Sequence, residues 1–189
     1  MSTEDLRRAY SIARAVMEGV TPEQYALSTP CASWKVRDLV NHLCEGANWV
    51  GLCVDAGKAP DPDPTHGVNY AAGDLLASYD IGVKATLAAF DAAGDKPVEL
   101  PFGTLPATVF MGIATTDQFT HAWDLATATG QDANLDRELA GRLFEGAKLV
   151  IADAFRGPEG SGAPFGPEQH APVGSSAAAQ LAAFLGRAV

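Results

Sequence analysis

Apolar residues recur at three- and four-residue intervals along most of the chain, which is the period of an amphipathic helix. Alternating runs of β-branched residues, which are typical of half-buried strands, are nearly absent. Segments rich in proline and glycine separate the helical patterns. We therefore expect an all-α protein, a four-helix bundle with additional short helices and a long C-terminal loop. The spacing predicts helices at about 3–19, 34–55, 69–92, 106–129, 135–155 and 176–187, with loops at 58–64, 95–104 and 157–175.

Two of the loops carry a further expectation. Val98, Glu99 and Leu100 are expected to form a short extended piece within the segment 95–104. The segment 157–175 is longer than an ordinary connection, and such a length is typical of functional or mobile loops.

Length and charge exclude several classes of protein. The 189 residues are expected to form one domain, residues 1–189. Acidic residues outnumber basic ones 23 to 13, which argues against nucleic acid and anionic membranes as partners, because both require a basic face. No apolar run approaches the ~18 residues of a membrane span, and the acidic N-terminus does not resemble a signal peptide. We expect a cytoplasmic protein whose cysteines, Cys31, Cys44 and Cys53, are reduced.

Candidate chemistry begins on the predicted helix 106–129. Asp117 and His121 are four residues apart and therefore lie on one helical face. A carboxylate and an imidazole at this spacing can ligate one metal ion. Their face is mostly small or apolar, which turns both side chains toward the bundle interior. It also carries Phe110, Ala114, Asp124, Leu125 and Ala128.

A third candidate ligand lies on the predicted helix 34–55. His42 is at the edge of the apolar stripe of that helix, between Leu39 and Trp49. Gly46, one turn further on, leaves space above the imidazole ring. This placement predicts that His42 faces a cavity.

Each feature also has a structural interpretation. A single histidine on a half-apolar face is more often a packed core residue than a ligand, and an ion pair explains Asp117 and His121 about as well. The three groups together make metal binding as good an explanation as packing. Asp38, Glu45 or Asp124 would then accept the spare N–H of a ligating histidine, or simply face solvent. A di-metal centre needs carboxylates from further helices, which offer no convincing partners.

The remaining candidates favour packing or exposure. Cys53 shares the stripe of His42 and would be either a thiol at the pocket mouth or, more often, a small buried apolar residue. Cys31 and Cys44 are interpreted as packing residues. The tryptophans are interpreted first as core, with Trp49 as a candidate pocket wall. His66 and His170 lie in loops and are expected to be exposed.

Two of these segments resemble a known family. Ser33 to Leu43, SWKVRDLVNHL, resembles the second-helix signature of the mycothiol-dependent maleylpyruvate isomerase N-terminal domain. That domain belongs to the DinB-like superfamily of metal-binding four-helix bundles. Residues 121–126, HAWDLA, resemble the fourth-helix signature, with Asp117 four residues upstream. The motifs FGPE at 165–168 and FLGR at 184–187 resemble an actinobacterial subfamily.

The resemblance implies a ligand set and a metal. Family members bind a divalent metal ion, commonly zinc or nickel, through one histidine of the second helix and two residues of the fourth. Carried over, these are His42, Asp117 and His121. The middle position is usually histidine or glutamate, and aspartate is one methylene shorter, so we expect weaker binding or a metal shifted toward the fourth helix. The isomerase has a further C-terminal domain that 189 residues cannot also contain, so maleylpyruvate isomerisation is not the expected reaction.

The ligand set favours one function and leaves others open. Two histidines and a carboxylate leave open coordination positions, which are typical of catalytic metal sites. A metal lowers the pKa of a bound thiol, which in this family is mycothiol. We expect a thiol-dependent S-transferase or isomerase acting on a small electrophilic substrate. A non-catalytic bundle that binds a small molecule or a partner, a metallohydrolase and a cofactor-independent enzyme remain open, as does a homodimer.

Overall fold

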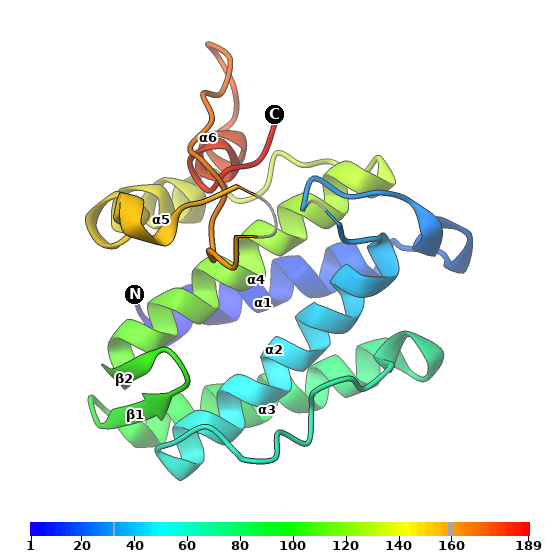
Figure 1. The fold of residues 1–189 in the computed structure, drawn as a ribbon. Helices are drawn as coiled ribbons and strands as arrows, with labels where there is room; N and C mark the ends of the chain where they lie inside the picture. Colours follow the sequence, from blue (N-terminus) through cyan, green and yellow to red (C-terminus); the bar gives the residue numbers. More distant parts are fainter. Residues whose placement is uncertain (32, 159–160) are drawn as a thin grey trace.

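The computed structural model describes residues 1–31, 33–158 and 161–189 (Figure 1). The protein is mostly helical over these residues, which confirms the all-α class. The α-helices are α1 (Thr3–Glu18), α2 (Val36–Ala56), α3 (Leu75–Ala93), α4 (Ala107–Thr129), α5 (Arg137–Val150) and α6 (Ala177–Phe184). Short 3₁₀ helices are η1 (Pro22–Ala26), η2 (Tyr70–Ala72) and η3 (Asp153–Phe155). Strands β1 (Pro97–Leu100) and β2 (Gly103–Pro106) form an antiparallel hairpin between α3 and α4.

Local side-chain chemistry determines where the helices begin and end. Ser2 and Asp5 form a capping box at the start of α1, in which each side chain accepts a hydrogen bond from the other residue's backbone N–H. The Asp74 carboxylate accepts from the N–H of Ala77 and begins α3. Helices α2 and α4 end at Gly57 and Gly130, which both have a left-handed φ of 71°.

Helices α1 to α4 pack on one another and enclose the first apolar core. Helix α1 lies against α4 and α3, and α2 lies against α3 and α4 (Figure 1). The apolar stripe predicted for α2 faces this core; it consists of Leu39, Val40, Leu43, Ala47, Val50 and Val54. Because α2 and α4 are neighbours, residues about halfway along each helix can reach one another.

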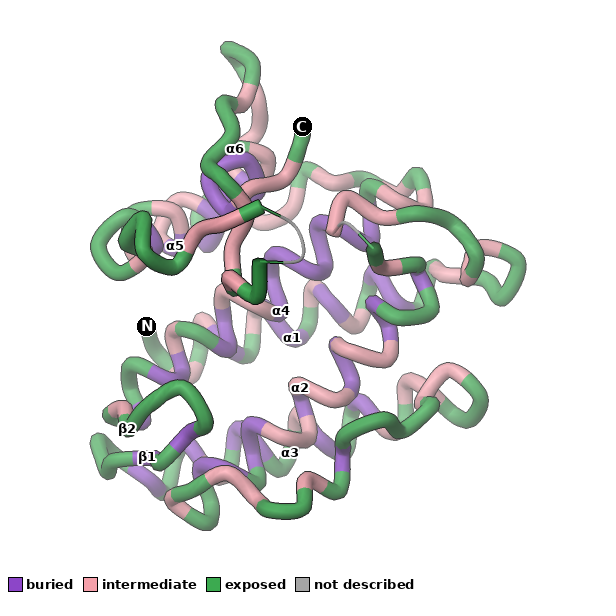
Figure 2. The backbone as a smooth tube through the Cα atoms, viewed as in Figure 1, coloured by how far each residue is buried: buried purple, intermediate pink, exposed green. Residues whose placement is uncertain are grey.

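Most residues of helix α4 from Ala114 to Ala126 are buried, because this part of the helix lies between two apolar cores (Figure 2). Its residues Phe110 and Leu125 contribute to the first core. Phe119 and Trp123 face the second core, which also contains Ala9 of α1 and the inner faces of α5 and α6. The C-terminal helices therefore cover the side of α4 that the first core leaves open.

The structure differs from the predictions in four places. Helix α6 ends at Phe184 and not at 187, because the turn at Gly186 follows it. Helix α3 begins at Leu75 and not at 69, because η2 and the Asp74 cap precede it. Helix α5 ends at Val150 and not at 155, and η3 follows. The extended piece at Val98–Leu100 is confirmed as part of β1, but its partner β2 was expected as loop and helix start. Four-residue strands contain too few alternations to be distinguished in a sequence. The described residues of 157–175 form no helix or strand, as expected.

Among the described residues, no helix is both long enough and apolar enough to cross a membrane.

Candidate metal centre

The structure brings the three predicted ligands together. His42 lies on α2, while Asp117 and His121 lie one turn apart on α4. The Asp117 Oδ1 atom is 3.3 Å from Nε2 of His42 and 3.5 Å from Nε2 of His121. One donor atom from each of the three side chains lies within 4.8 Å of the other two. Two helices thus converge on a single point through a carboxylate oxygen and two imidazole nitrogens.

These separations fit the size of a small divalent metal ion. Metal–ligand bonds of ~2.0–2.1 Å arranged as a tetrahedron separate neighbouring ligand atoms by ~3.3–3.4 Å. Both distances from Asp117 are close to this value, so the shorter side chain of aspartate reaches both histidines. Side chains of α4 occupy the space expected at Gly46, because a Cβ atom there would lie 3.7 Å from Asp117 Oδ2 and 3.2 Å from Gln118 Nε2. The missing side chain thus lets α4 approach α2 closely. The donor set and its spacing suit a bound metal ion.

One side of the centre is partly exposed to solvent, and the indole ring of Trp34 lies against another side. The side chains of His42 and Asp117 are 31% and 34% exposed, whereas His121 is buried. The Trp34 ring lies 4.7 Å from the His42 ring and 5.5 Å from the His121 ring, centroid to centroid. Ser33, immediately before it, has a φ of 67°, a conformation that is uncommon outside glycine. The half-buried Trp34 ring thus packs against both histidine rings.

Charge at the centre favours an ionised carboxylate between two imidazoles. Burial raises the pKa of Asp117, but the charges of His42, His121 and Arg187 and a hydrogen bond from His42 outweigh it and bring the pKa to about 2. Burial lowers the pKa of His42, and the neighbouring Asp117 carboxylate more than offsets this, so the net shift is upward. The carboxylate is thus available as a ligand at neutral pH.

A buried carboxylate holds the far side of the His121 ring. The Nδ1 atom of His121 lies 3.0 Å from Oδ2 of Asp124, whose side chain is fully buried. Burial raises the pKa of Asp124, but the hydrogen bond from His121 and the charge of Arg187 lower it by more. The net shift of the pKa is downward, so Asp124 is ionised. An ionised carboxylate only accepts hydrogen bonds, so Nδ1 of His121 is the donor to Asp124, and Nε2 is the ring nitrogen that faces Asp117.

The three acidic residues considered beside the histidines therefore have different places. Asp124 is the one that accepts the spare N–H of a candidate ligand. Asp38 accepts a hydrogen bond from the backbone N–H of Lys35 at the start of α2. Glu45 lies 3.1 Å from Nδ1 of the exposed His66. Of the three acidic residues, only Asp124 thus holds a candidate ligand, while Asp38 and Glu45 have other partners.

Sequence reasoning missed three residues of the centre. Trp34 was interpreted first as core, and Cys31 as packing. In the structure, Cys31 Sγ joins His121 and Asp124 in a second group of donor atoms within 4.8 Å of one another. Arg187 forms an ion pair with Asp124 at 2.9 Å across 63 residues of sequence. No periodicity connects these residues, although Arg187 lies in the FLGR motif.

The other candidate residues are packed in the core or exposed to solvent. Cys44 and Cys53 are fully buried, and burial raises the pKa of each thiol to about 12. Trp49 packs edge-on against Phe110, with ring centroids 5.8 Å apart. His66 and His170 are exposed, as expected.

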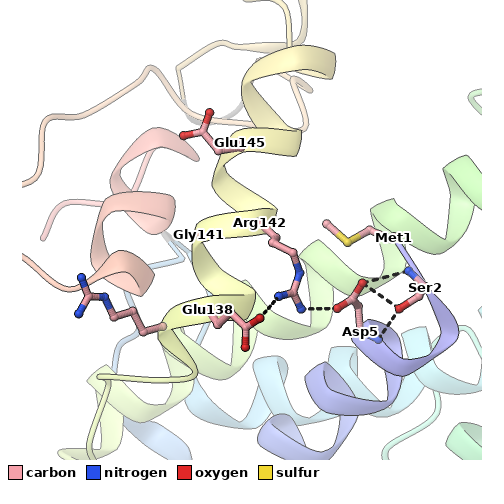
Figure 3. A pocket seen from close by; sticks show the side chains of 8 residues that line it. Met1, Ser2, Asp5, Glu138, Gly141, Arg142 and Glu145 are labelled. Atoms are coloured by element: carbon pink, nitrogen blue, oxygen red, sulfur yellow. Dashed lines mark hydrogen bonds and ion pairs between the residues drawn. The ribbon is translucent and has the colours of Figure 1, made fainter.

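A separate hollow lies between the start of α1 and helix α5 (Figure 3). Three of its charged side chains form one group: Arg142 donates to Asp5 and Glu138, and Asp5 also accepts from Ser2. None of the three converging ligands lines the hollow. These contacts attach α1 to α5.

Comparisons with known proteins identify the family. A family model described as the mycothiol maleylpyruvate isomerase N-terminal domain matches residues 6–126. Two proteins of Mycobacterium tuberculosis, uncharacterized protein MT0763 of strain CDC 1551 and uncharacterized protein Rv0738 of strain H37Rv, are each 37% identical over 185 residues. These matches span 97% of this chain and 96% of each relative.

A solved structure, described as that of the mycothiol-dependent maleylpyruvate isomerase, shares the fold. It aligns with a TM-score of 0.52 and 15% identity over 65% of this chain. The aligned part is 58% of the solved chain, so this protein corresponds to little more than half of that enzyme. On the match to the family model, the chain belongs to the mycothiol maleylpyruvate isomerase N-terminal domain family.

Proposed function

We propose that His42, Asp117 and His121 bind one divalent metal ion, zinc or nickel, and that the loaded protein is a thiol-dependent S-transferase or isomerase. Its thiol would be of the mycothiol type and its substrate a small electrophile. The observation that carries the proposal is the convergence of three donor atoms within 4.8 Å of one another, at a site where His42 and Asp117 are partly exposed and His121 is buried. Helices α1 to α4 would then be a DinB-like four-helix bundle within a single domain of residues 1–189.

The residues around the metal would have different roles. When bound, the metal would lower the pKa of a thiol and stabilise the thiolate nucleophile. His121, held at Nδ1 by Asp124, would bind the metal through Nε2, and Asp117 contributes negative charge. Three protein ligands leave a position open. The Trp34 ring lies against one side of the centre, so thiol and substrate would enter at the exposed edge of His42 and Asp117.

The comparisons support the thiol part of the proposal and limit the substrate. The family model and the solved relative are both named for mycothiol-linked maleylpyruvate isomerisation. Because the chain corresponds to 58% of the solved enzyme, we propose the class of chemistry and not maleylpyruvate itself as the substrate.

Metal analysis tests the ligand set. Protein purified without chelators is incubated with zinc or nickel, desalted and analysed for bound metal, as wild type and as His42→Ala and His121→Ala variants. We expect one ion per wild-type chain and a loss in both variants, with helical circular dichroism unchanged. The matched control is His66→Ala, because that histidine is 82% exposed and lies outside the converging group. A wild-type protein that takes up neither metal would refute the proposal.

A turnover assay tests the use of a thiol. The metal-loaded protein is mixed with a small electrophile, with and without mycothiol or a simpler thiol. We expect turnover only when the thiol is present and the metal is bound. Turnover without thiol would instead indicate a metallohydrolase, and metal binding without any turnover would indicate a non-catalytic binding protein.

A further inference from the structure

The FLGR motif at residues 184–187 ends α6 in a defined geometry. The N–H of Gly186 donates to the carbonyl of Ala183 at 2.9 Å, and the N–H of Arg187 donates to the carbonyl of Ala182 at 3.0 Å. With a φ of 95° at Gly186, these two bonds form a Schellman motif. The position of Arg187 relative to the helix axis is therefore determined by the helix end and not left to a free tail.

The FGPE motif at residues 165–168 supports the same helix end. A Cβ atom at Gly186 would lie 2.7 Å from Cα of Gly166, so the two glycine backbones touch. Arg156 donates from Nη1 to the carbonyls of Phe184 at 2.7 Å and Gly166 at 3.3 Å. Its guanidinium also lies 4.5 Å from the centre of the Phe184 ring. The two C-terminal motifs thus form one unit beside α4.

From this unit, the Arg187 side chain reaches Asp124. Nε lies 3.2 Å from Oδ1 and Nη2 lies 2.9 Å from Oδ2 of that carboxylate, while Nη1 donates to the carbonyl of Leu185 at 3.1 Å. The two side chains are 12% and 0% exposed. Each of the three guanidinium nitrogens thus has a protein acceptor, and two of them bind Asp124. The same Asp124 Oδ2 atom accepts the Nδ1–H of His121.

We propose that Arg187 is a positioning residue of the metal centre, acting on His121 only through Asp124. The proposal rests on the proposed function, since it takes His121 as a ligand. In Arg187→Ala the buried Asp124 carboxylate would lose the cation that binds both of its oxygens. Its Oδ2 atom would then no longer be fixed where it accepts the Nδ1–H of His121. The segment 165–187, which lies outside the matched residues 6–126, would in this way determine metal affinity at a site built on α2 and α4.

A double-mutant cycle on metal affinity tests this route. The zinc dissociation constant is measured by competition with a chromophoric chelator for Arg187→Ala, Arg187→Lys, Asp124→Asn and the Arg187→Ala/Asp124→Asn double variant. Changes of residues that hold a metal-binding histidine weaken affinity by ~10–100-fold, and we expect this for Arg187→Ala and Asp124→Asn. Arg187→Lys keeps the charge without the planar fork and should lie between. The double variant should be no weaker than Asp124→Asn alone.

The cycle includes controls for folding and for general loss of an ion pair. Arg142→Ala removes another partly buried, paired arginine, which binds Asp5 and Glu138 away from the centre, and should keep wild-type affinity. Thermal unfolding is recorded for every variant. If Arg187→Ala fails to fold, the double variant, which contains no unpaired buried carboxylate, still gives the decisive comparison with Asp124→Asn. A further loss in the double variant, or wild-type affinity in folded Arg187→Ala, overturns the proposal.

A readout without metal separates this proposal from the proposed function. NMR of the metal-free protein reports the hydrogen bond of the His121 Nδ1–H through the chemical shift and solvent exchange of that proton. We expect a protected Nδ1–H in the wild type and faster exchange of this proton in Arg187→Ala. A wild type that binds no metal but shows this change refutes the metal site and leaves the Arg187–Asp124–His121 link intact. An unchanged Nδ1–H in Arg187→Ala overturns the link itself.

Discussion

At the scale of single residues, the centre depends on one carboxylate oxygen that two imidazoles share. Asp117 Oδ1 lies 3.3 Å from His42 and 3.5 Å from His121, although aspartate is shorter than the residue usual at this position. The neighbouring Gly46 contributes by keeping the space beside Asp117 free of a side chain. The shorter acid is therefore accommodated by close packing of α2 on α4.

Asp117→Asn should weaken the metal centre and change the acid stability of the metal-free protein. The amide keeps the shape but not the charge, so we expect zinc affinity to fall by more than the ~100-fold typical of indirect changes. Because the pKa of Asp117 is lowered from 3.8 to about 2, its contribution to stability is present above pH 3.8 and is lost as the pH falls toward 2. The variant should lack this part of the acid transition, measured by circular dichroism.

The matched control for this change is Asp38→Asn on α2. Asp38 is also an acid on a helix of the centre, but its carboxylate accepts a hydrogen bond from the backbone N–H of Lys35. The side-chain oxygen of asparagine can accept the same hydrogen bond. We expect wild-type zinc affinity in this variant. Unchanged affinity in Asp117→Asn would remove Asp117 from the ligand set.

At the scale of secondary-structure elements, two glycines determine how closely α2 and α3 approach. A Cβ atom at Gly51 would lie 2.6 Å from Thr86 Oγ1 and 3.1 Å from the Thr86 backbone. One at Gly82 would lie 2.7 Å from the Asn48 side chain. The helices are therefore nearly in backbone contact, and the Thr86 hydroxyl uses this proximity to donate to the carbonyl of Ala47 at 2.7 Å.

Gly51→Ala should destabilise the protein although alanine is the better helix former. We expect a loss of ~1–3 kcal/mol from overpacking against Thr86, which exceeds the ~1 kcal/mol gained in helix propensity. Gly141→Ala in α5 is the matched control, because nothing lies within 4 Å of a Cβ atom there, and it should gain up to ~1 kcal/mol. Urea unfolding measures both, and stabilisation by Gly51→Ala would contradict this packing.

The sequence allowed the long helices and their ligands to be predicted, but not the contacts between distant segments. Periodicity placed α1, α2 and α4 to within two residues, and the four-residue spacing identified Asp117 and His121. The hairpin partner Gly103–Pro106 was missed because it is short and bounded by a proline. Arg187 was missed as a functional residue because its partner Asp124 lies 63 positions earlier, and only the folded α6 brings them together.

At the scale of the whole molecule, α4 is shared by two apolar cores. Leu125 faces the core of α1 to α4, while Phe119 and Trp123 face α5 and α6. Ion pairs from Arg8 to Asp136 and from Arg142 to Asp5 also join α1 to the C-terminal part. Because both cores need α4 in place, we expect them to unfold together, as a single domain of residues 1–189 would.

Single-tryptophan variants can test this cooperativity. Trp49 packs in the first core and Trp123 in the second, so each reports on one of them. Two proteins that keep only Trp49 or only Trp123, with the other tryptophans replaced by phenylalanine, are unfolded in urea. We expect fluorescence midpoints that coincide with each other and with circular dichroism in each protein. A second core that melts first would divide the chain into two units.

The distance in sequence between the candidate ligands affects how fast the metal-free protein would be degraded. His42 and Asp117 are 75 positions apart, so one ion between them would act as a reversible cross-link that the unfolded chain lacks. At a metal concentration 100 times the dissociation constant, such a ligand stabilises the folded state by ~2.7 kcal/mol. Molecules deprived of metal would open more often and be degraded sooner, so the amount of this protein in a cell would follow its metal supply.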